Sequence, residues 1–265
     1  MRKQWRYFLL ALGFFTRIPV PSLADFQESD LNYSAKYFPL IGIIVGVVGG
    51  LSFYVASQIL PQSLAVLISM VATIYLTSAF HEDGLADSAD GLGGGYTRER
   101  ILTIMQDSRL GTYGAVVLFL MLFAKYQLLI TINPAVIPAV LIAGHALSRL
   151  SAVWLMATLS YAKPDGKAKP LATQIGGAGL VVANVFGLLP FVIIIAMLNM
   201  ANHSWLVILK FVLMTLLPVL LSWAWWRAKI NQWLAGYTGD TLGAMQQISE
   251  LAFYLGVLVW VGKGI

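Results

Sequence analysis

The chain has 265 residues, 58% of them hydrophobic and only 11% charged, and its mean hydropathy is +0.77. This composition excludes an ordinary soluble enzyme and predicts an all-α, polytopic integral membrane helical bundle. The absence of cysteine excludes disulfides, thiolate metal sites and cysteine catalysis, and basic cytoplasmic loops explain the net charge of +5 more simply than a nucleic-acid partner, which we do not expect.

The first 24 residues resemble a secretory signal peptide, with a basic start, a short apolar run at 7–15 and a cleavage-site pattern at 22–24. Arg17, Pro19 and Pro21 interrupt this pattern, and the apolar run is too short to span a bilayer. We therefore predict an N-terminal amphipathic or re-entrant helix on the cytoplasmic membrane surface.

Seven apolar segments follow, each close to the ~20 residues that a bilayer requires. Glycines in the first of them have the spacing of closely packed helices. No segment repeats another and no low-complexity tract divides the chain, so residues 1–265 are predicted to form a single membrane-embedded domain. The seven predicted transmembrane helices are residues 38–60, 63–80, 110–132, 135–160, 178–199, 204–226 and 241–262.

Lysine and arginine are unevenly distributed over the connections between these segments. They occur before the first span and between the second and third, the fourth and fifth, and the sixth and seventh, whereas the other three connections contain none. The positive-inside rule therefore places the N-terminus and the basic connections in the cytoplasm. We expect a multi-pass protein of the bacterial inner membrane whose polar loops on this side face the cytoplasm.

An acidic block, residues 81–91, follows the second predicted span. It contains four of the 12 acidic residues in the chain: Glu82, Asp83, Asp87 and Asp90. In a continued helix the three aspartates are spaced i, i+4, i+7 and share one face, where they repel one another unless a cation neutralises them. Oxygen ligands of this kind suit magnesium, manganese or calcium rather than zinc. The alternative is an acidic loop that is simply solvated.

Other polar groups are predicted at the same membrane face. Arg98, Arg100 and Arg109 follow the block, and Asp240 begins the last span in a glycine-flanked turn. Carboxylates for a divalent metal, cations for phosphate and glycines for close backbone approach together indicate phosphoryl or nucleotidyl transfer.

Three ionisable residues, Lys125, Arg149 and Glu250, lie within spans, where such groups usually face a cavity and indicate function. His145 precedes Arg149 by four residues and shares its helical face. Arg149 is expected within reach of the acidic block; the alternative is a structural partner for one buried carboxylate.

The motifs of this chain resemble those of the cobalamin synthase family, the adenosylcobinamide-GDP ribazoletransferases, which are multi-span membrane enzymes. The acidic block Glu82–Gly91 is the most specific of them. One departure is Ala235, where we expect the family to prefer glycine. The other matching motifs are Thr16–Pro21, Tyr37–Gly42, Asp107–Gly114, His145–Arg149 and Thr238–Gly243.

The resemblance implies a reaction. A ribose hydroxyl of α-ribazole, or of its 5′-phosphate, attacks the cobinamide-side phosphate of adenosylcobinamide-GDP, GMP leaves, and adenosylcobalamin or its 5′-phosphate forms. Magnesium would be held by the four acidic residues of the block and would bridge the diphosphate. Expected partners are these two substrates and the lipid bilayer, and a homo-oligomer is left open.

Roles for individual residues follow from the same resemblance. Asp240 is the favoured base for the ribose hydroxyl, with His81 and, deeper in the membrane, Glu250 as the other candidates; the alternative for Asp240 is a helix cap. The residues predicted to bind substrate are Arg17, Asp107, Arg109, Arg149 and Lys167.

Two rival functions remain at this point. One is another metal-dependent intramembrane enzyme, a CDP-alcohol phosphotransferase or a prenyltransferase; the former's motif begins like residues 83–86 but has arginine where this chain has Asp87. The other is a cation-coupled transporter, whose acidic residues would lie near mid-membrane, whereas here they gather at one face.

Overall fold

The computed structural model describes residues 3–22, 28–162, 174–200 and 204–262, and in these ranges the chain is helical without a β-strand. The prediction of an all-α bundle is confirmed. The helices are α1 (Lys3–Phe15), α2 (Glu28–Ser34), η1 (Ala35–Tyr37), α3 (Phe38–Ser57), α4 (Gln62–Leu76), α5 (Phe80–Gly94), α6 (Arg98–Ile104), α7 (Thr112–Thr131), η2 (Pro134–Val136), α8 (Ile137–Thr158), α9 (Gly177–Met200), α10 (Trp205–Leu234) and α11 (Gly239–Gly262).

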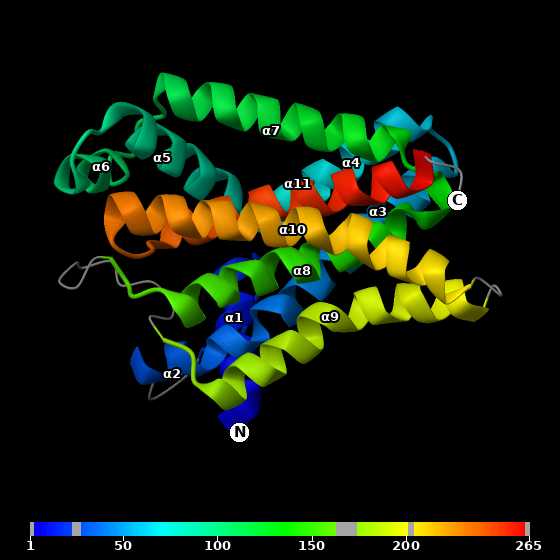
Figure 1. Cartoon of the computed structure of the whole chain (residues 1–265), viewed down its shortest axis with the longest axis horizontal. Helices are drawn as coiled ribbons and strands as arrows, with labels where there is room; N and C mark the ends of the chain where they lie inside the picture. Colours follow the sequence, from blue (N-terminus) through cyan, green and yellow to red (C-terminus); the bar gives the residue numbers. More distant parts are fainter. Residues whose placement is uncertain (1–2, 23–27, 163–173, 201–203, 263–265) are drawn as a thin grey trace.

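Among the described residues, six helices are long and apolar enough to cross a membrane, and α4 with α5 makes a seventh span if the bent pair is counted as one. The long helices run along the long axis of the molecule, with α5 and α6 at one end and the C-terminus at the other (Figure 1). This agrees with about seven transmembrane helices. The N-terminal helix is also present, and α1 buries one face that includes Leu9, Leu12 and Phe15.

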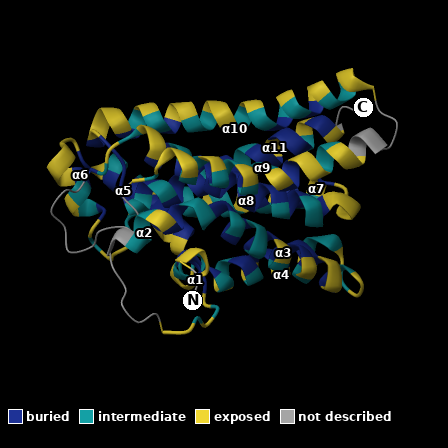
Figure 2. Cartoon of the chain, turned by 90° about the horizontal axis from the view of Figure 1, so that it is seen from below, coloured by how far each residue is buried: buried dark blue, intermediate teal, exposed yellow. Residues whose placement is uncertain are grey.

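Two helices form the centre of the bundle. Within an apolar stretch of 18 residues in each helix, 78% of the residues are buried in α8 and 61% in α11. The corresponding shares are 17% in α7 and α10 and 22% in α9. Figure 2 shows exposed residues along the outer side of α10 and buried ones in the interior. The exposed apolar side chains of α7, α9 and α10 are expected to face lipid, which is apolar as well. A helix can face lipid because its backbone hydrogen bonds are made within the helix.

Glycines allow α3 to lie directly against α8. A Cβ on Gly42 would overlap the backbone of His145, and one on Gly46 would lie 2.5 Å from Cα of Ile142. The predicted role of these glycines in close helix packing is confirmed.

The second predicted span, 63–80, corresponds to α4, which ends a few residues earlier than expected. α4 ends at Leu76, and α5 begins after a bend of 85°. Ser78 and Ala79 at the bend both have φ of 55°, an uncommon conformation for residues other than glycine. Arg17 stabilises the bend, because its Nε donates to Ser78 Oγ (2.8 Å) and its amide to the Leu76 carbonyl (2.9 Å). The bend turns the acidic block back against α7 and α11.

Candidate active site

The acidic block is helix α5, and it packs against the N-terminal half of α11 through glycine. A Cβ on Gly84 would lie 2.8 Å from the Asp240 carbonyl oxygen and 3.3 Å from Cα of Gly243. No larger residue fits this contact without moving one helix. The acidic block and Asp240, which are far apart in the sequence, therefore lie on touching helices.

The four carboxylates of α5 do not converge. Asp83 is exposed and Asp87, one turn further, is half-buried, whereas Glu82 and Asp90 are buried. Asp90 caps helix α7, because its Oδ2 accepts from the amide of Gly111 and its Oδ1 from that of Gly114, each at 2.8 Å. The carboxylate also offsets the positive end of the helix dipole.

Glu82 points into the bundle, where its Oε1 accepts a hydrogen bond from Gln247 Nε2 (2.9 Å). Within the described parts of the chain, no three His, Asp or Glu side chains are arranged to hold a metal ion. Asp83 and Asp87 are the two carboxylates on the accessible side of α5. They fit a magnesium ion that takes its other ligands from water and substrate phosphate, the usual mode for this metal.

Asp240 lies in the first turn of α11, but a neighbouring pair caps that helix. The Thr241 amide donates to Thr238 Oγ1 (3.3 Å), and the Thr238 amide donates to Thr241 Oγ1 (2.8 Å). The Asp240 carboxylate accepts from Thr238 Oγ1 at 3.3 Å. Burial, with a smaller effect from the nearby Asp240 charge, raises the pKa of the Tyr161 hydroxyl to about 12.

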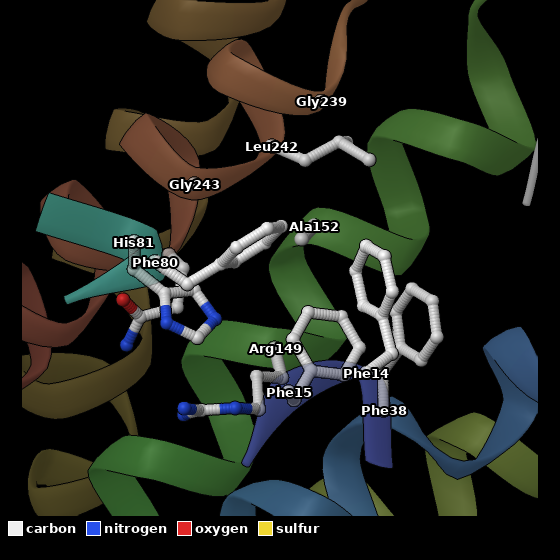
Figure 3. Close-up of a pocket in the computed structure, with 11 residues that line it drawn as sticks. Phe14, Phe15, Phe38, Phe80, His81, Arg149, Ala152, Gly239, Leu242 and Gly243 are labelled. Carbon is white, nitrogen blue, oxygen red and sulfur yellow. The ribbon is translucent and has the colours of Figure 1, made fainter. Parts of the chain in front are cut away.

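A pocket of about 40 Å³ opens beside Gly239 and Gly243 (Figure 3). His81 forms part of its wall and stacks on Phe15 of α1, with ring centroids 5.7 Å apart and planes 11° from parallel. The contribution of α1 to this pocket was not predicted from the sequence. Five aromatic rings contribute to this aromatic pocket, whose lining residues are Phe14, Phe15, Phe38, Phe80, His81, Arg149, Ala152, Gly239, Leu242, Gly243 and Gln246.

The residues predicted to bind substrate are dispersed. Arg17 stabilises the α4–α5 bend, and Arg149 is buried beside the pocket. Asp107 and Arg109 form an exposed ion pair (2.6 Å), and the hydrogen bonds from Arg109 lower the pKa of Asp107 to about 2. Lys167 lies outside the described residues.

A buried polar network lies behind the pocket. Lys125 Nζ is 3.0 Å from Glu250 Oε1, and His145 Nδ1 is 3.2 Å from Glu250 Oε2. Tyr254 donates its hydroxyl to Glu250 at 3.0 Å, and Lys125 also donates to Gln247 at 3.1 Å. The sequence singles out the three ionisable residues of the spans, but not Gln246 and Gln247. Two adjacent amides within an apolar helix were the available signal.

The model of the cobalamin-5-phosphate synthase family matches residues 7–258. Curated relatives named adenosylcobinamide-GDP ribazoletransferase include those of Shewanella piezotolerans (strain WP3 / JCM 13877) and Ralstonia pickettii (strain 12J). The first is 42% identical over 97% of this chain and 96% of its own length, and the second 40% identical over 99% of both. The relative from Shewanella amazonensis (strain ATCC BAA-1098 / SB2B) is 43% identical over 97% of this chain and 96% of its own length.

No solved structure matches the chain. The family model and the relatives cover nearly the whole sequence, including α5, the α10–α11 turn and the pocket residues. The chain therefore belongs to the cobalamin-5-phosphate synthase family.

Proposed function

We propose that this protein transfers the adenosylcobinamide-phosphate moiety of adenosylcobinamide-GDP to α-ribazole or α-ribazole 5′-phosphate and releases GMP. The observation on which this depends most is the full-length similarity to relatives named for that transfer. Family membership does not favour the rival transferases or a transporter. The geometry agrees with this reaction. Helices α5 and α11 touch, and near their contact lie two accessible carboxylates of α5, Asp240 of α11 and a pocket lined by Arg149.

The reaction requires little covalent chemistry from the protein, which mainly has to position the reacting groups and stabilise their charge. The ribose oxygen forms a bond to the cobinamide-side phosphorus as the bond from that phosphorus to the GMP oxygen breaks, and the hydroxyl proton passes to a base. We propose Asp240 as the base, because it lies against Gly84 of α5 where α5 and α11 touch. Asp83 and Asp87 would hold magnesium, which neutralises charge on the diphosphate and on departing GMP.

Purified protein in detergent, supplied with both substrates and magnesium, is expected to release one GMP for each adenosylcobalamin or adenosylcobalamin 5′-phosphate formed. Chromatography of both products measures the ratio. Chelation with EDTA should stop the reaction and added magnesium should restore it, because the diphosphate then lacks its neutralising cation. Corrinoid product without GMP would contradict the reaction, and full turnover in EDTA would contradict the metal.

We further propose that the α5–α6 end faces the cytoplasm in the bacterial inner membrane. The support is the distribution of lysine and arginine, which are absent from the connections at the opposite end.

The native chain has no cysteine, so single cysteines report on this orientation. Tyr96→Cys replaces a side chain that is 87% exposed at the α5–α6 end, and Ile59→Cys one that is 83% exposed at the other. In intact spheroplasts, a membrane-impermeant maleimide should label the Ile59→Cys protein and reach the Tyr96→Cys protein only after lysis. The reverse pattern would overturn the orientation.

A further inference from the structure

Besides Asp90, which caps α7, four side chains that normally carry a full charge are buried in the described parts of the bundle: Glu82, Lys125, Arg149 and Glu250. Lys125 and Glu250 form a direct ion pair at 3.0 Å. One carboxylate, Glu82, and one guanidinium, Arg149, then remain. Because a buried charge without a partner of opposite sign is strongly destabilising, this pair should neutralise each other.

Glu82 and Arg149 line the same polar cavity, together with Thr73, Thr77 and His145. Its volume of about 10 Å³ is close to what one water molecule needs. Glu82 Oε2 and Arg149 Nε are both buried without a hydrogen-bond partner in the structure. One is an acceptor that lacks a donor and the other a donor that lacks an acceptor, and a single bridging water satisfies both.

The other polar atoms of both groups fix their orientation. Lys125 donates to Gln247 Oε1 (3.1 Å), and Gln247 donates to Glu82 Oε1 (2.9 Å), which leaves Oε2 for the cavity. Arg149 Nη1 donates to the His145 carbonyl at 3.1 Å. We infer that Glu82 and Arg149 form a water-bridged ion pair, and that Glu82 is a positioning residue for Arg149 rather than a magnesium ligand.

This pair has a consequence for the substrate, which depends on the proposed function. The Arg149 side chain runs along the wall of the aromatic pocket, with its guanidinium directed away from the phenylalanine rings (Figure 3). Glu82 and its water fix that cation at the wall of the pocket, where His81 and Gln246 are the other polar side chains. An anionic group of the substrate, such as a phosphate, then meets an oriented guanidinium at no further cost in side-chain ordering.

A thermal double-mutant cycle tests the pair without using enzyme activity. Glu82→Gln and Arg149→Met should each lower the melting temperature in detergent by roughly 10 °C, because each leaves one buried charge unpaired. The double variant has neither charge and should lose less than the sum of the two, by at least roughly 5 °C. Asp83→Asn is the matched control, since Asp83 is the exposed neighbour, and its combination with Arg149→Met should be additive. Additive losses for Glu82→Gln with Arg149→Met would overturn the pair.

Magnesium titration of GMP release separates positioning from metal binding. Asp83→Asn should raise the magnesium concentration for half-maximal rate at least ~10-fold, because it removes a charged ligand. Glu82→Gln should leave that concentration within ~2-fold of wild type while raising KM for adenosylcobinamide-GDP at least ~10-fold, through the loss of an oriented charge-assisted contact. An equal magnesium shift in both variants would make Glu82 a metal ligand. If wild type releases no GMP, the proposed function fails, but the thermal cycle still decides the pair.

Discussion

Replacing Glu250 by alanine is expected to destabilise the folded protein by about 3–5 kcal/mol, the cost of removing one partner of a buried ion pair. Glu250 is 1% exposed near the middle of α11. It receives contacts from two other helices, since Lys125 lies on α7 and His145 on α8, and within α11 it accepts a hydrogen bond from the hydroxyl of Tyr254. Its loss leaves the Lys125 ammonium in the interior of a membrane bundle without a counter-charge.

Thermal unfolding of the purified protein in detergent measures this effect. At ~2–4 °C per kcal/mol, the melting temperature should fall by at least ~6 °C. Glu99→Ala removes an exposed carboxylate at the start of α6 and should change it by less than ~2 °C. Combining Glu250→Gln with Lys125→Met removes both charges and should recover part of the loss. An alanine variant as stable as wild type would show that water reaches this site and screens the pair.

Hydropathy predicted most of the spans because its cause is local. A run of ~20 apolar residues must satisfy its backbone within itself, so α3, α7, α8, α9, α10 and α11 follow from the sequence to within a few residues, apart from the longer C-terminal end of α10. The α4–α5 bend has no such local cause. Neither glycine nor proline occurs at 77–79, and the conformation of Ser78 depends on Arg17, which is 61 residues away. Local sequence propensity therefore could not predict the contact between Arg17 and Ser78.

The candidate site likewise has a part that the sequence could predict and a part that it could not. The acidic block could be found from its composition, and so could the ionisable residues of the spans. The arrangement of the four carboxylates could not, because it depends on distant partners: Asp90 caps α7 across 21 and 24 residues, and Glu82 meets Gln247 across 165. The i, i+4, i+7 spacing predicted a shared face for the aspartates, but only Asp83 and Asp87 remain accessible. Ala235 is a smaller instance, since its φ of 53° places an alanine where glycine is favoured.

Asp240→Asn is expected to reduce turnover at least ~100-fold, the scale of a lost acid–base group, while leaving the melting temperature within ~2 °C of wild type. The stability should survive because Thr238 and Thr241 cap α11, and because asparagine keeps the size and the hydrogen-bonding oxygen of the side chain. Turnover should not survive, because an amide cannot accept the proton of a ribose hydroxyl. GMP release and differential scanning fluorimetry measure the two effects on the same preparation.

Thr238→Ala is the matched control, because it should produce the opposite pattern. It removes the N-cap oxygen that accepts from the Thr241 amide, at a cost of ~1 kcal/mol in stability. It also removes the hydrogen bond at 3.3 Å from Thr238 Oγ1 to Asp240, but it keeps the Asp240 carboxylate itself. Its turnover should stay within ~10-fold of wild type. Binding of adenosylcobinamide-GDP should be retained in both variants, since neither changes Arg149 or the aromatic pocket. If Asp240→Asn keeps its turnover, the carboxylate is not the base. His81 then becomes the candidate, because its imidazole can accept a proton and it lines the pocket beside α11.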